Sequence, residues 1–317
     1  MIKIAVDLQG ADRPQTQLAA GAVRAVRENE DLFLYICGNA EELRGFAEGE
    51  GRIEVIAAPG IITNEDDPAE AFKNKKDSSL VKAMELCKND PGIGGLVSCG
   101  PTGAIFVSAL MMLGRIARVS PMLTVELRKL SGEPLCIVDC GANVDCRAEK
   151  LVDFARMGIA YMKAVGVESP KVGLLSNGAE DTKGTDVVKK ANELLRGSGL
   201  RFIGNVEGHC VLTGEADVIV CDGFSGNILL KCIEGTAKTV LAQLGSMTSA
   251  AKKECAELYT KYDYNTQGGA VLLGTKLPIV KGHGAATDET VYNIIGTAYR
   301  LAKNRINDKI KSEFSQG

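Results

Sequence analysis

Short apolar runs rich in β-branched residues alternate with amphipathic segments from one end of the chain to the other. The runs predict eight strands, at residues 2–6, 32–36, 52–56, 96–99, 135–139, 172–175, 202–204 and 218–221. Between them, apolar residues recur at helical spacing, as in the segment that follows Thr185. Because strands and helices alternate, we expect an α/β fold with a mostly parallel sheet covered on both faces.

The domain organisation is predicted from the continuity of this pattern. No internal repeat, low-complexity tract or linker interrupts it, so residues 1–317 are expected to form one unit, with two lobes sharing a continuous sheet as the alternative. Residues 225–264 read as a helical segment whose apolar stripe runs from Ile228 to Leu244. This stripe is longer than one sheet face needs, and the segment is therefore predicted to form a dimer contact.

Composition and charge exclude several classes of protein. Hydrophobic residues make up 45% of the 317 positions and the net charge is −3, so the chain lacks the basic field that binds nucleic acid. No apolar run approaches the roughly 18 residues needed to span a bilayer, and the N-terminus lacks the layout of a signal peptide. We expect a cytoplasmic protein whose ten cysteines are reduced and mostly buried.

Several predicted strands end in similar loops, at residues 6–14, 97–104, 138–145, 174–185, 204–209 and 220–227. Each loop combines glycine with Asn, Ser, Thr or Asp, and most precede a helix. Ligands of open α/β sheets bind at the carboxyl ends of the strands, and glycine lets backbone amides at a helix start approach an anion. One such loop is more often an ordinary connection with a helix cap. Six in one chain favour a shared anion site.

The familiar cofactor and metal motifs are absent from the sequence. There is no P-loop, no dinucleotide-binding glycine fingerprint after a strand, and no zinc-type pairing of cysteines or histidines. The run GFSGN at 223–227 resembles a hydrolase nucleophile elbow but lacks its final glycine, and His209 and His283 are the only histidines. We therefore expect neither a metal ion nor a cofactor.

A few side chains near these loops are candidates for binding an anion. Lys75 precedes a predicted helix start at Ser78, and Lys183 lies at a loop-to-helix turn. Lys231 follows Asn227 by one helical turn and so shares its face. His283 lies between two glycines after an apolar run. Each lysine also fits a solvated surface, and the histidine also fits a structural role.

At these loops the chain resembles the PlsX phosphate acyltransferase family, in order over nearly its whole length. The matching runs are Asp7 with GAD (10–12) and Pro14, KKDSS (75–79), SCGPTGA (98–104), DCGANVD (139–145), GLLSNGAEDTKG (173–184), GNVEG (204–208), DGFSGNILLKCIEG (222–235), GGAVLLG (268–274) and KGHG (281–284). The resemblance implies a three-layer α/β/α fold of two lobes around a cleft, similar to isopropylmalate dehydrogenase and phosphotransacetylase, and a homodimer. It also implies transfer of a fatty acyl group from acyl carrier protein to inorganic phosphate, giving acyl phosphate for phospholipid synthesis.

The chain departs from the family pattern at several positions. Pro101 replaces an asparagine, Ala179 replaces an acid and Val119 replaces a proline. These changes indicate a divergent member and leave open whether the donor is acyl carrier protein, acyl-CoA or another thioester. The helix tip that resembles a membrane anchor in relatives is short and polar here, at residues 244–253, so membrane contact is expected to be weak or absent.

The implied reaction needs a phosphate pocket, donors for the developing oxyanion and exclusion of water, but no catalytic nucleophile of the protein. The expected phosphate contacts are Lys75, Ser78, Thr102 and Gly103. The expected catalytic residues are Lys183, Asn205 and Asn227 at the carbonyl oxygen, and His283, which protonates the leaving thiolate or positions phosphate. The residues expected to orient these groups are Glu207, Asp222 and Lys231.

Three alternatives remain open from the sequence. Cys99 ends a predicted strand before a helix start that would lower its pKa, so it is either an acyl-carrying nucleophile or a buried structural thiol. A nicotinamide-dependent decarboxylating dehydrogenase would need an arginine cluster and metal-binding aspartates, which we do not find. A non-catalytic homologue that binds acyl carrier protein is suggested only by Pro101 and Ala179.

Overall fold

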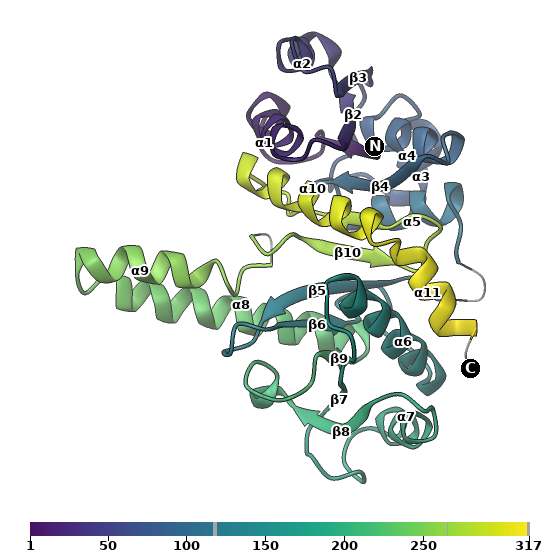
Figure 1. The fold of residues 1–317 in the computed structure, drawn as a ribbon, viewed down its shortest axis with the longest axis vertical. Coiled ribbons are helices and arrows are strands. Elements are labelled where there is room, and N and C mark those ends of the chain that lie inside the picture. Colours follow the sequence, from purple (N-terminus) through teal and green to yellow (C-terminus); the bar gives the residue numbers. More distant parts are fainter. Residues whose placement is uncertain (117–118, 265, 316–317) are drawn as a thin grey trace. The chain divides into compact units, whose positions relative to one another are not determined.

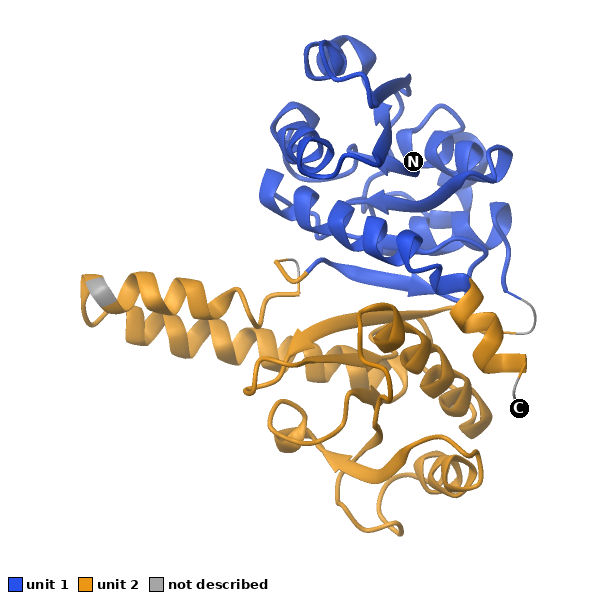
Figure 2. Cartoon of the chain, viewed as in Figure 1, with its two compact units in different colours: residues 1–118, 268–307 blue, residues 119–267, 308–317 orange. Residues whose placement is uncertain are grey.

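The computed structural model describes residues 1–116, 119–264 and 266–315. The chain forms two compact units, shown in blue and orange in Figure 2. Unit 1 contains residues 1–118 and 268–307, and unit 2 contains residues 119–267 and 308–317. Helix α11 (Ile306–Ser315) contains the point where the C-terminal residues pass from the first range to the second.

Unit 1 is built on a sheet with strand order β3-β2-β1-β4-β11-β10. Its strands are β1 (Ile2–Asp7), β2 (Leu32–Gly38), β3 (Ile53–Ala57), β4 (Ile93–Ser98), β10 (Ala270–Leu273) and β11 (Ile279–Lys281). All neighbours pair in parallel except β10, which is antiparallel to β11. Its helices are α1 (Gln15–Glu28), α2 (Ala40–Ala47), α3 (Pro68–Asn74), α4 (Ser79–Asn89), α5 (Thr102–Met112) and α10 (Asp288–Lys303). Helices α1 and α10 pack together against the sheet, and α4 covers its other face (Figure 1).

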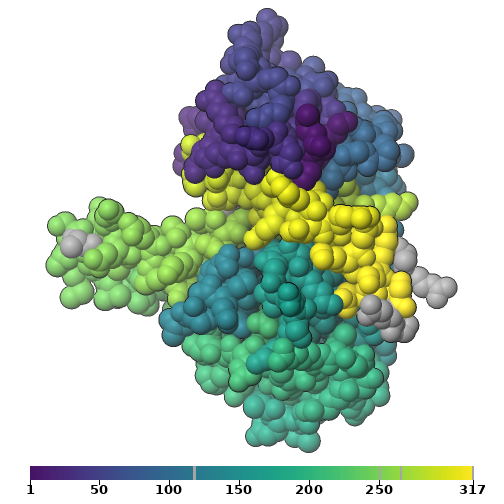
Figure 3. All heavy atoms as spheres, viewed as in Figure 1, coloured from purple at the N-terminus to yellow at the C-terminus, as the bar shows by residue number. Residues whose placement is uncertain are grey.

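Unit 2 is built on a sheet with strand order β5-β6-β9-β7-β8. Its strands are β5 (Met122–Arg128), β6 (Pro134–Val138), β7 (Val172–Ser176), β8 (Phe202–Glu207) and β9 (Val218–Val220). Only β5 is antiparallel to its neighbour. Its helices are α6 (Ala148–Ala164), α7 (Asp186–Arg196), α8 (Gly223–Gly245) and α9 (Ser249–Tyr259), with a 3₁₀ turn η1 (Gly208–Cys210). Helices α8 and α9 form a hairpin that projects from the body of this unit (Figures 1 and 3).

The predicted α/β class and mostly parallel pairing are confirmed, and each predicted strand corresponds to a strand of the structure. The prediction did not include β5, β10 and β11. In β5 the charged residues Glu126 and Arg128 interrupt the apolar pattern, yet Glu126 is buried. Its carboxylate pairs with Arg128 at 3.0 Å and accepts a hydrogen bond from the Tyr161 hydroxyl at 3.0 Å. A buried charge is tolerated when it is paired in this way. The prediction relied on apolar runs and therefore missed this core strand.

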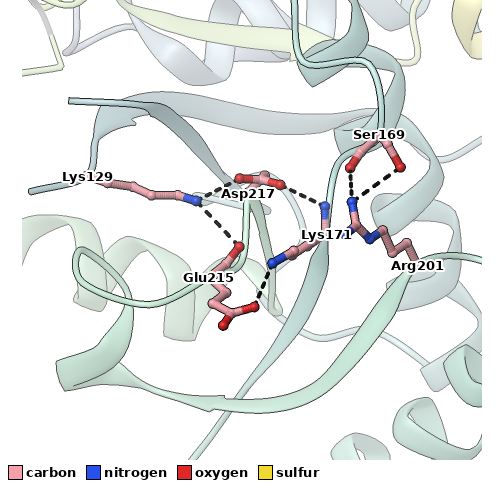
Figure 4. Close-up of polar contacts among 6 residues, drawn as sticks. All are labelled: Lys129, Ser169, Lys171, Arg201, Glu215 and Asp217. Atoms are coloured by element: carbon pink, nitrogen blue, oxygen red, sulfur yellow. Dashed lines mark hydrogen bonds and ion pairs between the residues drawn. The ribbon is translucent and has the colours of Figure 1, made fainter. Parts of the chain in front are cut away.

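In unit 2 polar and charged contacts join residues of the loops that precede four strands, β6, β7, β8 and β9 (Figure 4). Lys129 pairs with Asp217 at 2.7 Å, and the other carboxylate oxygen of Asp217 accepts from the Lys171 amide at 2.8 Å. Lys171 in turn pairs with Glu215 at 2.6 Å, and Arg201 donates to the Ser169 carbonyl oxygen at 3.0 Å. This network secures the edge where the parallel strands begin. The opposite edge, where they end, carries the glycine loops.

We predict that Gly21→Ala destabilises unit 1. A Cβ at Gly21 in α1 would lie 1.9 Å from the carbonyl oxygen of Asp288 in α10, so the two helices would have to separate. Overpacking of this kind costs about 1–3 kcal/mol. The measurement is the free energy of unfolding in urea. The matched control is Gly296→Ala on α10, where a Cβ meets nothing within 4 Å and the helix propensity of alanine should raise stability. Equal effects of the two substitutions would contradict the packing.

Candidate functional site

In unit 1 three glycine turns contact one another at the edge where β1, β4 and β11 end. These strands run parallel, so their carboxyl ends share one edge. A Cβ at Gly10, whose φ is +83°, would lie 3.1 Å from the Cα of Gly100, so only glycine allows the two loops to approach this closely. The Gly282 amide donates to the Ser98 carbonyl oxygen at 2.9 Å, and the Asp12 amide donates to the Gly284 carbonyl oxygen at 2.7 Å. The loops predicted at 6–14 and 97–104 therefore form one cluster with residues 281–284.

The buried carboxylate of Asp7 lies beneath this cluster. It accepts hydrogen bonds from the hydroxyls of Ser79 at 2.5 Å and Ser98 at 2.6 Å, and from the Gln9 amide at 3.2 Å. Ser98 also accepts from the Gly100 amide at 3.1 Å. Burial raises the pKa of Asp7 to about 6, although the two hydroxyls act in the opposite direction. Asp7 thus connects the end of β1 to the start of α4 and to the turn after β4.

The amino terminus of α5 has the features of an anion site. Pro101 occupies the N-cap position and, within the described part of the chain, makes no side-chain cap hydrogen bond. The first two helical residues, Thr102 and Gly103, are exposed. By contrast, the side chains of Ser78 and Asp222 cap α4 and α8. The first backbone N–H groups of α5 are thus left for an external acceptor, and the helix dipole favours a negative one.

Two expected phosphate ligands of unit 1 have other partners. Ser78 is completely buried and its hydroxyl accepts from the Val81 amide at 3.4 Å as the cap of α4, so the prediction that it contacts phosphate is wrong. Lys75 donates to Asp66 at 2.8 Å and to the Ile61 carbonyl oxygen at 3.0 Å. The hydrogen bond from Lys75 is the main cause that lowers the pKa of Asp66. Lys75 therefore holds the loop before α3.

Of the two alternatives for Cys99, the structure favours the buried structural thiol over the acyl-carrying nucleophile. Cys99 is buried, with a relative exposure of 1%, and its sulfur lies where a Cβ at Gly282 would approach to 2.8 Å. Burial raises the pKa of Cys99 to about 12, with a smaller contribution from the charge of Asp7. The desolvation of the thiolate outweighs the helix start that the sequence suggested.

His283 follows β11 and is exposed. Its Nδ1 accepts a hydrogen bond from the Ala285 amide at 3.1 Å. In the neutral ring this bond assigns the proton to Nε2, which leaves Nε2 as a donor on the surface of the loop cluster. The geometry suits a group that donates a hydrogen bond to a ligand.

In unit 2 a second cluster forms where β6, β9, β7 and β8 end. The buried carboxylate of Asp139 accepts five N–H hydrogen bonds, from the amides of Leu123, Gly141, Ala142 and Asn143 and from the Asn143 side chain, at 2.6–3.1 Å. The start of α8 packs on this turn. A Cβ at Gly226 would lie 1.9 Å from the Asp139 carbonyl oxygen, and one at Gly223 would lie 2.8 Å from the Asn143 carbonyl oxygen. The spacing of the two glycines in GFSGN thus serves close packing.

The loop that carries Lys183 is fastened to α7 and β8. Asn205 donates to the Glu180 carbonyl oxygen at 2.8 Å and accepts from Asn192 at 2.9 Å. Arg196 pairs with Asp181 in the same loop. Asn205 is nearly buried, and both ends of its amide are already engaged, so its contacts favour a structural role over the predicted contact with the oxyanion. It positions the loop instead.

The other predicted residues of unit 2 are distributed around this edge. Lys183 and Asn227 are exposed, and the stem of Lys183 lies where a Cβ at Gly178 would be 2.7 Å away. Asp222 accepts from the Ser225 amide at 2.8 Å and from its hydroxyl at 2.9 Å, so it orients the start of α8. Lys231 pairs with Glu234 at 2.7 Å.

Glu207 ends β8 opposite Ser176 in register. Beside this pair the edge opens into a cavity of about 710 Å³. Its polar lining comes from Ser176, Asn177, Thr185, Asp222 and Ser225, and its apolar lining comes from Leu151, Leu174, Val188, Phe224, Ile228 and Leu229. The buried hydroxyl oxygen of Ser176 has no hydrogen-bond partner among the residues that the structure describes. A buried polar group without a partner indicates a place for a ligand or a water molecule.

Ser176 was not among the predicted site residues. In the sequence it reads only as the polar end of a strand, and its lack of a partner depends on how Gly184 and the loop fold over it. The signal that could have marked it is its place at the start of the SNGAEDTKG run.

Comparisons with known proteins identify the fold. EutD phosphotransacetylase from Staphylococcus aureus matches with a TM-score of 0.63 and 18% identity, over 95% of this chain and 94% of that one. A phosphotransacetylase from Streptococcus pyogenes gives a TM-score of 0.63 and 19% identity over the same shares. A 4-hydroxythreonine-4-phosphate dehydrogenase from Klebsiella pneumoniae gives a TM-score of 0.56 and 13% identity, over 95% and 100%. The chain therefore has the α/β fold of the phosphotransacetylases.

Sequence comparison is more specific than the fold. Residues 2–309 match the family described as "Fatty acid synthesis protein". Proteins named phosphate acyltransferase from Clostridium acetobutylicum and a Geobacillus species are 36% and 37% identical to the chain, over 99% of it and 99% of their own lengths. The chain belongs to this fatty acid synthesis protein family, the PlsX family of acyltransferase enzymes.

Two properties of the described residues concern metal binding and membrane crossing. Within residues 1–116, 119–264 and 266–315, no group of three or more His, Cys, Asp or Glu side chains is placed to hold a metal ion. In the same described ranges, no helix combines the length and the apolar character needed to cross a bilayer.

We predict that Asp7→Asn removes a pH dependence of stability. The folded pKa of about 6 exceeds the ordinary carboxyl value of 3.8, so the folded state binds the proton more tightly than the unfolded state. This contribution is present in full below the unfolded pKa and is lost as the pH rises through 6. The free energy of unfolding of the parent should fall by about 2 kcal/mol more than that of Asp7→Asn between pH 4 and 7. Parallel pH profiles of the two proteins would contradict this role.

Proposed function

We propose that this protein transfers a fatty acyl group from the thioester of acyl carrier protein to inorganic phosphate in the cytoplasm, giving acyl phosphate for phospholipid synthesis. Membership of the PlsX family supports acyl transfer to phosphate. The observation that carries the proposal is the exposed, uncapped amino terminus of α5. It offers backbone donors to an oxyanion without a metal ion.

The predicted residues supply different parts of this chemistry. The amides of Thr102 and Gly103 bind phosphate, and His283 positions it with a hydrogen bond from Nε2. Lys183 and Asn227 donate to the carbonyl oxygen of the thioester as it becomes negative. A phosphate oxygen attacks the carbonyl carbon, the new carbon–oxygen bond forms as the carbon–sulfur bond breaks, and the thiolate takes up the proton that hydrogen phosphate loses. No group of the protein is acylated.

The buried thiols support a direct attack. Burial raises the pKa of Cys99 to about 12, and it also raises the pKa values of Cys140 and Cys221 at the turns of unit 2 well above the usual range. A thiol that stays protonated is a poor nucleophile. Direct transfer to phosphate requires none.

The reaction is tested with purified protein, palmitoyl-(acyl carrier protein) and phosphate. We expect phosphate-dependent release of the carrier thiol and an acyl phosphate that hydroxylamine traps as a hydroxamate. Palmitoyl-CoA should react more slowly. Carrier binding without turnover would favour a non-catalytic homologue. Thioester loss at the same rate without phosphate would show a thioesterase and overturn the proposal.

The roles in unit 2 are tested with Lys183→Ala and Asn227→Ala. Each should lower kcat by about 100-fold or more, because loss of one oxyanion donor commonly costs that much. Lys189→Ala is the matched control, since Lys189 lies exposed on α7 and its contact with Asp186 is a surface pair at 3.8 Å. If the two test variants keep their rate within about twofold, Lys183 and Asn227 do not stabilise the oxyanion.

A second copy of the chain is the proposed partner of the α8–α9 hairpin. Leu244 and Met247 at its far end are 45% and 74% exposed. Burial of such side chains favours association. We expect a dimer in sedimentation equilibrium, and Leu244→Glu combined with Met247→Glu should weaken it by at least tenfold. Lys253→Glu on the exposed face of α9 is the control. A parent protein that stays monomeric at micromolar concentration would disprove this contact.

A further inference from the structure

The cavity of about 710 Å³ at the strand edge of unit 2 continues into a second hollow of about 660 Å³ along α8. The two share Gly208, Leu229 and Cys232 in their linings, so they are contiguous. A Cβ at Gly208 would lie 3.9 Å from the Leu229 side chain, which places these two residues in contact at the junction.

The two hollows differ in polarity. The first has a polar end, where the unpartnered Ser176 hydroxyl lies with Asn177, Asp222 and Ser225. The second is lined by α8, η1 and the C-terminal part of α9. Its α8 residues recur at i, i+3, i+4 and i+7 and carry no charge: Leu229, Cys232, Ile233, Thr236, Ala237, Val240 and Leu241. Polarity therefore decreases from the strand edge outwards.

We propose that this continuous groove binds the acyl chain of a long-chain thioester. The inference rests on the proposed function and adds a binding site to it. The thioester end lies at the polar rim beside Ser176, and the methylene chain passes Leu229 and Cys232 into the second hollow. From Leu229 to Leu241 the helix advances about 18 Å, which suits a long rather than a short chain. Each methylene that moves from water into such a groove makes binding more favourable.

The shape of the groove favours a chain over a second protein surface. Its walls on both sides of α8 belong to unit 2 itself, with Gly208, His209 and Leu212 on one side and Leu258 and Tyr262 on the other. An open groove whose lining belongs to one unit and is mostly apolar fits a linear apolar ligand. Leu244 and Met247, the residues assigned above to the contact between copies, are not part of either lining.

Cys232 reports occupancy of the groove directly. It is exposed at the junction, whereas Cys255 on α9 is partly exposed and belongs to neither lining. In a Cys210→Ser protein without phosphate, maleimide modification of both thiols is followed by mass spectrometry. Palmitoyl-CoA should slow modification of Cys232 at least tenfold and leave Cys255 unchanged. CoA and butyryl-CoA should protect neither.

Several different results would contradict the proposal. Absence of protection by palmitoyl-CoA overturns the proposal, and so does equal protection of both thiols. Reactivity of Cys232 that falls with protein concentration and ignores palmitoyl-CoA would assign the groove to a second copy. Because the labelling needs no turnover, it succeeds or fails separately from the hydroxamate assay.

A second measurement uses chain-length selectivity. Cys232→Trp places a large ring at the junction, so the ratio of kcat/KM for palmitoyl to butyryl thioester should fall at least tenfold. Thr239→Trp introduces the same ring on an exposed position of α8 outside both linings and should leave the ratio unchanged. An unchanged ratio in Cys232→Trp, with the protein folded by circular dichroism, would also overturn the proposal.

Discussion

The loops of both units depend on buried carboxylates at strand ends. Glycine turns have few side chains that can hold them in place, and a backbone that binds an anion must keep its amides in a fixed direction. Asp7 binds two hydroxyls and one amide, and thereby fixes the end of β1, the start of α4 and the turn after β4. Asp139 binds five N–H groups and fixes the turn on which α8 begins. Each unit thus places one buried acceptor below its reactive loops.

Much of the fold could be predicted because the alternation of apolar runs and amphipathic segments is local information. The strand β5 escaped because Glu126 and Arg128 neutralise each other inside the core, which only the folded structure shows. The site was predicted less well. Glycine loops are visible in the sequence, and one shared site was predicted from them, whereas within each unit the structure shows one cluster of loops. The direction of a side chain is not visible in the sequence. Ser78 and Asn205 have polar groups that could bind an anion, but Ser78 caps a helix and Asn205 holds a loop.

Side chains that hold the structure alternate along these loops with side chains that are exposed. Asp222 caps α8, whereas Asn227, in the next turn of that helix, is exposed. Asn205 is engaged, whereas Lys183, in the loop that Asn205 fastens, is exposed. A donor that is exposed on a fixed backbone needs little reorganisation when charge develops beside it, which is the physical basis of electrostatic catalysis.

The close packing of Gly226 on the Asp139 carbonyl oxygen determines the direction of the whole of helix α8. Helix α8 has 23 residues and is about 35 Å long, and its first turn rests directly on the backbone of the Asp139 turn. A tilt of the helix axis at Gly226 displaces the far end of α8 more than the near end. Even one methyl group on Gly226 would therefore shift the distal half of α8 by far more than its own size. Selectivity for the length of a bound chain could therefore be altered from a position that never touches the chain.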